Sequence, residues 1–128
     1  MNRNLPYVSS YKKLSSYKNA MELSDKIFQL STDFPKEETY SLTDQIRRSS
    51  RSIGAQIAEA WGKRRYVKHF VSKLTDAYAE TYETEHWISI AFRCGYLNEE
   101  TSNTLNNDCA RLCQLLGGMM SKADQFCK

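Results

Sequence analysis

The chain contains 128 residues, a length typical of a single domain. Its composition, 41% hydrophobic and 26% charged, is that of a soluble globular protein and argues against an intrinsically disordered chain. Only two prolines and five glycines interrupt the sequence. This favours long helices over β-structure with many turns, and no apolar run is long enough to span a membrane.

The cysteines and the first residues bear on the compartment. All four cysteines lie late in the chain, at Cys94, Cys109, Cys113 and Cys127. A disulfide framework would instead join distant loops, so reduced thiols in a cytoplasm are expected. The opening "MNRNLPYVSS" lacks the apolar core of a secretory signal peptide, which agrees with that location.

The first two predicted helices cover about residues 11–33 and 41–61. In the first, apolar side chains recur at alternating spacings of three and four residues, the pattern of one buried helix face, at Ala20, Leu23, Ile27, Leu30 and Phe34. Pro35 ends this helix, because the residue before a proline avoids helical geometry. In the second, Ser41 and Asp44 approximate a capping box, and Gly62 is expected to end the helix. Its apolar seam comprises Ile46, Ser50, Ile53, Ile57 and Ala60.

The third and fourth predicted helices cover about residues 66–94 and 98–127. The third has an expected seam of Val67, Val71, Leu74, Tyr78, Thr81, Glu85, Ile88 and Phe92, and Gly95 closes it. Asn98 is expected to cap the fourth, whose regular stripe comprises Leu105, Cys109, Leu112, Leu116, Met119, Ala123 and Phe126. Four amphipathic helices with short connections favour antiparallel neighbours. The predicted fold is therefore all-α, an antiparallel up-and-down four-helix bundle forming one domain over residues 1–128.

Charge is distributed very unevenly along the sequence. The whole chain has a net charge of +3, yet residues 47–73 hold eight basic side chains against Glu59 alone, whereas residues 74–128 hold four basic and eight acidic ones. Basic residues neutralise phosphates, and neighbouring aromatics such as Tyr66 can stack on unpaired bases. The candidate nucleic-acid-binding residues are Arg47, Arg48, Arg51, Lys63, Arg64, Arg65, Lys68 and Lys73. An ordinary solvated charge run is the alternative interpretation.

Small side chains on the second helix suggest a subunit contact. Gly54 within a helix costs about 1 kcal/mol relative to alanine, which some gain should offset. An outer face of small residues lets a second backbone approach closely, so the predicted oligomer interface comprises Gly54, Ala55, Ala58 and Gly62. An exposed alanine-rich face without a partner is the alternative.

Sites for metals or catalysis find little support. Glu83 and His86 have the spacing of a di-iron motif, but the second copy of that motif is missing. Cys109 and Cys113 share a helical face, yet Cys109 lies on the apolar stripe, where cysteine serves as a small hydrophobe. Glu80 and Glu85 near the third seam need partners, and a structural role is favoured over ligand binding. No catalytic residue, metal or cofactor is therefore predicted.

The stretch "FPKEETYSLTDQIRRSSRSIGAQIAEAWGKRR" resembles the motif of the bacterial four-helix-bundle proteins encoded within 23S rRNA intervening sequences. The matching positions are Phe34, Pro35, Glu37, Glu38, Leu42, Thr43, Gln45, Ile46, Arg47, Arg48, Ser52, Ile53, Ile57, Ala58, Glu59 and Gly62. The resemblance implies an antiparallel four-helix bundle that assembles into ring-like pentamers, with no established enzymatic activity. That family is similar in fold to the accessory proteins of diversity-generating retroelements, which bind nucleic acid and a reverse transcriptase.

The leading hypothesis is a non-enzymatic homo-oligomer, a pentamer by the resemblance, that contacts RNA or DNA through its basic segment. The first alternative is a protein–protein interaction scaffold without a nucleic-acid role, whose basic patch meets an acidic partner. A reverse transcriptase enters as a partner by family analogy alone. The remaining alternative is a metal-binding bundle enzyme. No membrane association is expected.

Overall fold

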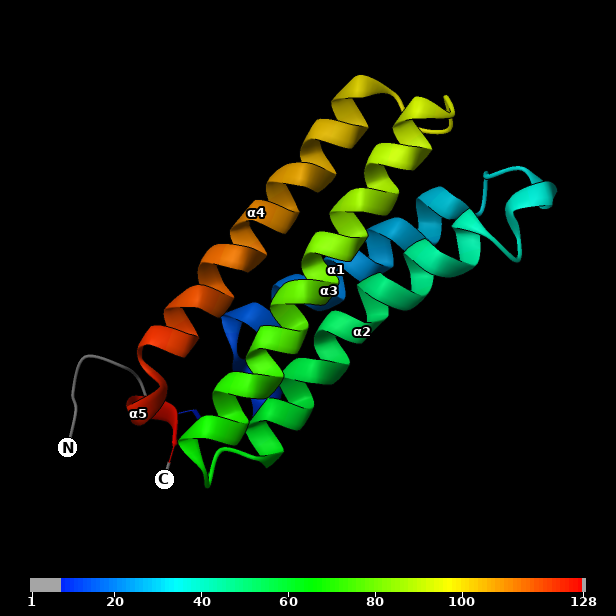
Figure 1. Ribbon diagram of the computed structural model, residues 1–128. Coiled ribbons are helices and arrows are strands. Elements are labelled where there is room, and N and C mark those ends of the chain that lie inside the picture. Colours follow the sequence, from blue (N-terminus) through cyan, green and yellow to red (C-terminus); the bar gives the residue numbers. More distant parts are fainter. Residues whose placement is uncertain (1–7, 128) are drawn as a thin grey trace.

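The computed structural model describes residues 8–127, which form four long helices and a short fifth one (Figure 1). Their bounds are α1 Ser15–Ser31, α2 Leu42–Gly62, α3 Val67–Arg93, α4 Glu99–Ser121 and α5 Ala123–Phe126, with 3-10 turns η1 at Tyr11–Lys13 and η2 at Lys36–Glu38. No strand occurs in this described range, so the predicted all-α class is confirmed. None of the helices found there combines the length and the hydropathy needed to cross a membrane.

Two helix bounds differ from those predicted. The first predicted helix, 11–33, is divided because Leu14 has extended backbone angles, φ −65° and ψ 134°, so η1 precedes a shorter α1. The fourth, 98–127, is interrupted at Lys122, with φ −112° and ψ 27°, where α4 ends and α5 begins. The predicted bounds of the second and third helices, 41–61 and 66–94, differ from those of α2 and α3 by about one residue at each end.

Caps explain where the later helices start and stop. The side chain of Asn98 accepts a hydrogen bond from the backbone N–H of Thr101 at 2.7 Å, as predicted for the start of α4. Gly95, at φ 79°, adopts the left-handed conformation that turns the chain after α3. At the start of α2 the predicted capping box does not form. Ser41 Oγ instead donates to Glu38 Oε1 at 2.6 Å.

Glu38 joins the start of α2 to the α3–α4 turn. Its second carboxylate oxygen, Oε2, accepts a hydrogen bond from the Tyr96 hydroxyl at 2.8 Å. The hydrogen bond from Ser41 and then that from Tyr96 lower the pKa of Glu38, because both stabilise the carboxylate. The same bond, with a smaller effect of burial, raises the pKa of Tyr96 to about 12. The pairing therefore favours an ionised Glu38 and a neutral Tyr96.

The core lies between the four long helices. Fully buried apolar side chains come from every one of them, including Leu23, Ile27, Ile46, Ile53, Ile57, Phe70, Leu74, Ile88, Leu105, Leu112 and Leu116. The predicted stripe of the fourth helix is confirmed from Leu105 to Ala123, with Phe126 half-buried.

The buried face of α3 is rotated from the predicted seam. Its buried residues are Phe70, Leu74, Ala77, Thr81, Thr84, Ile88 and Ala91. Val67 and Phe92, expected in the seam, are 40% and 43% exposed. The shift follows from contact with α2, where the Thr84 hydroxyl donates to Ser49 Oγ at 3.0 Å.

Candidate nucleic-acid interface

The eight predicted basic residues fall into three groups. Arg47 and Arg51 lie in the first half of α2, beside Phe28 of α1. Their guanidinium carbons are 4.7 Å and 5.4 Å from the centroid of the Phe28 ring, within the range of a cation–π interaction. Arg47 Nε also donates to Ser31 Oγ at 2.8 Å. Arg48 is exposed on the same helix. Arg47 and Arg51 therefore contribute to packing between α1 and α2.

Lys73 forms a group of its own, because its charge is already compensated. Its ammonium group lies 3.6 Å from a Glu59 carboxylate oxygen on α2 and 3.4 Å from one of Asp76. The Lys73 side chain is only 18% exposed. It has less positive charge to offer a ligand than the sequence suggested.

The third group surrounds the turn between α2 and α3 and comprises Lys63, Arg64, Arg65 and Lys68. Arg64 lies with its guanidinium carbon 4.0 Å from the Trp61 ring centroid, and its Nη1 donates to the Trp61 carbonyl oxygen at 2.9 Å. A cation in this position satisfies one of the free carbonyls at the end of α2 and complements the helix dipole. Lys63, Arg65 and Lys68 are exposed.

The first and third groups do not form one patch. Lys63 follows Arg51 by twelve positions, just past the end of α2, which corresponds to about 18 Å along the helix axis. In the sequence the basic residues look like one continuous segment, because the distance along the helix axis is not visible there. The structure brings only the four residues of the turn together.

Aromatic residues at the turn divide into buried and exposed. Phe70 is fully buried, and its ring stacks on that of Phe126 in α5 at 6.0 Å between centroids. Trp61 is half-buried beneath Arg64. Tyr66 is 56% exposed, and its ring lies 5.5 Å from that of the exposed His69. Phe70 therefore anchors the start of α3 while Tyr66 and His69 face outwards.

Other segments bring further positive charge to this end of the molecule. Figure 1 places the α2–α3 turn and α5 at one end, and η1 packs against α1 and α2 there. We define the basic end as residues 8–14, 62–69 and 121–127. It holds seven basic side chains and a single acidic one, Asp124. Lys12, Lys13 and Lys122 could not be assigned to this site from the sequence, because they are distant in the chain from the basic residues of the α2–α3 turn.

The opposite end of the molecule has the opposite sign. We define the acidic end as residues 32–41 and 94–100, the segment after α1 and the α3–α4 turn (Figure 1). It holds five acidic side chains and one basic one, Lys36; the acids are Asp33, Glu37, Glu38, Glu99 and Glu100. The two ends of the fold therefore carry net charges of opposite sign.

The predicted face of small residues is only partly on the outside. Gly54 is buried, because an ideal Cβ there would lie 3.6 Å from Tyr17 Cε1 and 3.8 Å from Met21 Sδ of α1. Its expected position on the outer face is therefore wrong, because the helix that packs beside Gly54 is α1 of the same chain. Ala55 and Gly62 are exposed and Ala58 is half-buried.

The rejected metal candidates have other contacts. Glu83 accepts a hydrogen bond from Trp87 Nε1 at 3.1 Å. Cys109 is fully buried, and burial raises the pKa of its thiol to about 12, which favours the neutral form. Burial also raises the pKa of the Cys113 thiol, and the half-buried Glu85 carboxylate adds a smaller effect in the same direction on both thiols. Within residues 8–127, no three or more His, Cys, Asp or Glu side chains cluster closely enough to hold a metal ion.

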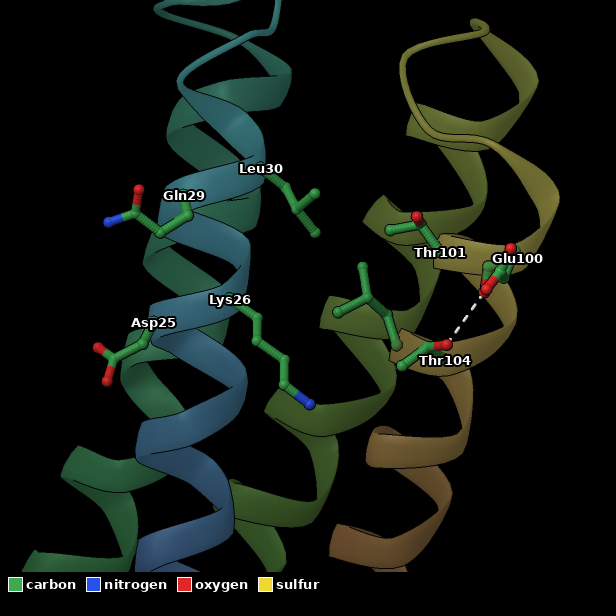
Figure 2. Close-up of a pocket in the computed structure, with 8 residues that line it drawn as sticks. Asp25, Lys26, Gln29, Leu30, Glu100, Thr101 and Thr104 are labelled. Atoms are coloured by element: carbon green, nitrogen blue, oxygen red, sulfur yellow. Dashed lines mark hydrogen bonds between the residues drawn. The ribbon is translucent and has the colours of Figure 1, made fainter.

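A groove of about 490 Å³ lies between α1 and α4, away from the basic end. Figure 2 shows residues that line it, with Asp25, Gln29 and Leu30 on α1 and Thr101 and Thr104 on α4. Lys26 reaches across towards α4, where its ammonium group lies 2.9 Å from Asp108. Because its one basic side chain is paired, this groove offers no free cation for a phosphate.

These features define a class: an all-α protein of four long helices with a strongly basic end. The chain belongs to the 23S rRNA-intervening sequence protein family, whose profile matches residues 12–118. The predicted family is thereby confirmed.

A crystal structure supports the same assignment. It is that of a protein with unknown function from the S23 ribosomal protein family of Bacteroides thetaiotaomicron VPI-5482. The two chains are 30% identical, and the similarity covers 83% of this chain and 95% of the other, with a TM-score of 0.74. A search of curated proteins gives no significant match.

Proposed function

We propose that the protein is a non-enzymatic, nucleic-acid-binding bundle whose contact surface is the basic end. The observation that carries this proposal is the accumulation of seven basic side chains against Asp124 alone. Among the residues that the structure describes, Lys63, Arg65 and Lys68 take part in no salt bridge. Their charge is available to phosphates, which supply most of the affinity in sequence-independent binding.

The arrangement behind this surface is an antiparallel up-and-down four-helix bundle. Contacts between opposite helix ends support it. Ser16, early in α1, donates to the sulfur of Met119, late in α4, at 3.1 Å. Ser49, early in α2, meets Thr84, late in α3, and Glu59, late in α2, meets Lys73, early in α3. Such a bundle gathers alternate connections at each end, which is how the basic end forms.

Salt dependence and matched variants test the binding. If the four residues of the turn neutralise four phosphates, log K falls with log[salt] at a slope of about −2.8 for single strands or −3.6 for duplex DNA. Arg65→Glu with Lys68→Glu changes two exposed side chains of the turn and should abolish most affinity. The control, Arg48→Glu with Arg51→Glu, changes the net charge equally but lies outside the basic end. It should retain most affinity.

Two outcomes would contradict this function. One is the absence of binding by the wild type at about 50 mM salt, where phosphate contacts are strong. The other is an equal loss in the two double variants, which would make net charge rather than the basic end responsible. The first result favours the alternative of a protein–protein interaction scaffold. The second removes the basic end as the contact surface but leaves nucleic-acid binding in place.

A homo-oligomer, with the pentamer as the expected state, completes the proposal. The exposed small residues Ala55 and Gly62 beside the half-buried Ala58 support a close helix contact between subunits. Ala55→Glu should dissociate the assembly in native mass spectrometry while leaving the circular dichroism spectrum unchanged, because its side chain has no place in the core. Ala58→Glu should act in the same direction. A monomeric wild type at micromolar concentration would refute this part.

A further inference from the structure

We infer that the basic end selects single-stranded over double-stranded nucleic acid, with an unpaired base stacked on Tyr66. The inference rests on the proposed function and specifies its ligand class. Tyr66 is the last residue before α3 and has extended backbone angles, φ −121° and ψ 117°. Its ring remains 56% exposed although Phe70, one turn later, is fully buried. The two aromatics are thus divided between the core and the surface.

The surroundings of the Tyr66 ring suit a nucleotide. The guanidinium carbon of Arg65 lies 5.6 Å from the ring centroid, and the His69 ring lies 5.5 Å away at an interplanar angle of 55°. Lys63 and Lys68, both exposed, lie on either side of this group in sequence. An aromatic face next to uncompensated cations can hold a base and its phosphate together.

Exposure of an aromatic ring alone would not support this inference. Tyr40 is more exposed, at 94%, but it belongs to the acidic end, between Glu38 and Asp44 in sequence. A phosphate chain is repelled there. Tyr66 combines the accessible ring with the positive field, and Tyr40 therefore provides a matched control.

Duplexes cannot use the Tyr66 ring in the same way. Base faces inside a duplex are covered by their neighbours, and only phosphates, sugars and base edges remain accessible. The turn can still bind a duplex through its charges, but only unpaired bases gain the stacking contribution. RNA and DNA single strands share this chemistry, since each base presents a π-face.

The test measures the affinity of the full-length protein for three fluorescent probes: oligothymidylate, oligouridylate and a mixed-sequence DNA duplex. Each probe has about 20 nucleotides or base pairs, so that it is longer than one binding site. Fluorescence anisotropy at one salt concentration gives the affinities. The wild type should bind both single strands about 10-fold more tightly than the duplex. Tyr66→Ala should remove this preference, lowering single-strand affinity about 10-fold and leaving duplex affinity unchanged.

Three further measurements separate stacking from charge. Tyr66→Phe should bind like the wild type, because stacking does not need the hydroxyl. Tyr40→Ala should change nothing. The salt slope of Tyr66→Ala on single strands should equal that of the wild type, since no charge is lost.

The possible failures are distinguishable. Equal affinity of the wild type for single strands and duplex, or an equal loss on both in Tyr66→Ala, would overturn the inference and leave the proposed function intact. Binding to none of the three probes would overturn the proposed function itself. A preference for oligouridylate over oligothymidylate that persists in Tyr66→Ala would overturn the inference, because that selectivity would depend on the 2′-hydroxyl or the 5-methyl group, which distinguish the two strands, and not on the Tyr66 ring.

Discussion

Replacement of Gly54 by alanine should stabilise the protein, although this glycine is buried between two helices. Glycine inside a helix costs about 1 kcal/mol relative to alanine, because it loses more backbone freedom on folding. The added Cβ would lie 3.6 Å from Tyr17 Cε1 and 3.8 Å from Met21 Sδ, which are ordinary van der Waals distances. The backbone preference should therefore outweigh any packing cost. The expected gain is about 1 kcal/mol, or about 4 °C in Tm for a domain of this size.

Urea unfolding followed by circular dichroism measures this change, at one protein concentration because assembly would shift the midpoint. Gly117→Ala in α4 is the matched control, since nothing lies within 4 Å of the added Cβ and only the backbone preference acts. Gly54→Leu should instead cost about 1–3 kcal/mol by overpacking against Tyr17. A destabilised Gly54→Ala beside a stabilised Gly117→Ala would refute the reasoning, because α1 and α2 would then approach too closely for a methyl group.

Two further predictions concern polar contacts between elements. Because the pKa of Glu38 is lowered, its stabilising effect is present above pH 4.5 and lost as the pH falls through the lowered value. The pKa of Tyr96, raised from 10.0 to about 12, makes stability decline as the pH rises through this interval. Tyr96→Phe should flatten the alkaline decline and weaken the acid one in urea titrations, and identical profiles would count against the pairing. Ser49→Ala should cost about 1 kcal/mol, since Thr84 loses one buried partner but still donates to the Glu80 carbonyl oxygen at 2.9 Å. A loss of less than a few tenths of a kcal/mol in the free energy of urea unfolding would show that water replaces the Ser49 hydroxyl.

The sequence predicted best where a helix has one clear apolar face. The stripe of α4 is buried from Leu105 to Ala123 because large apolar residues mark it without competition. On α3, large apolar residues such as Val67 and Phe92 are exposed, whereas the small residues Ala77 and Ala91 are buried. Hydropathy favours large side chains, whereas several buried positions of α3 are small, so the predicted seam is rotated from the buried face. Leu74, Thr81 and Ile88 are buried as predicted, and Val67 and Phe92 are not.

The candidate site was predictable only in part for a different reason. Lys63, Arg64, Arg65 and Lys68 are neighbours in sequence and remain neighbours in the fold. Gly54 was assigned to the outer face because nothing local shows that the Tyr17 ring approaches it. The contributions of η1 and α5 depend on which helix ends meet, and this is a property of the topology rather than of any segment.

The separation of charge between the basic and acidic ends gives the molecule a permanent electric dipole moment. The ends lie about 30 Å apart, the length of the 21-residue helix α2, whereas the Debye length at physiological ionic strength is about 8 Å. Each end is therefore screened from the other, and the acidic end does not cancel the attraction of the basic end for a polyanion. A polyanion that comes within this screening distance exerts a torque on the dipole. The torque turns the basic end towards the polyanion before contact, which raises the fraction of productive encounters.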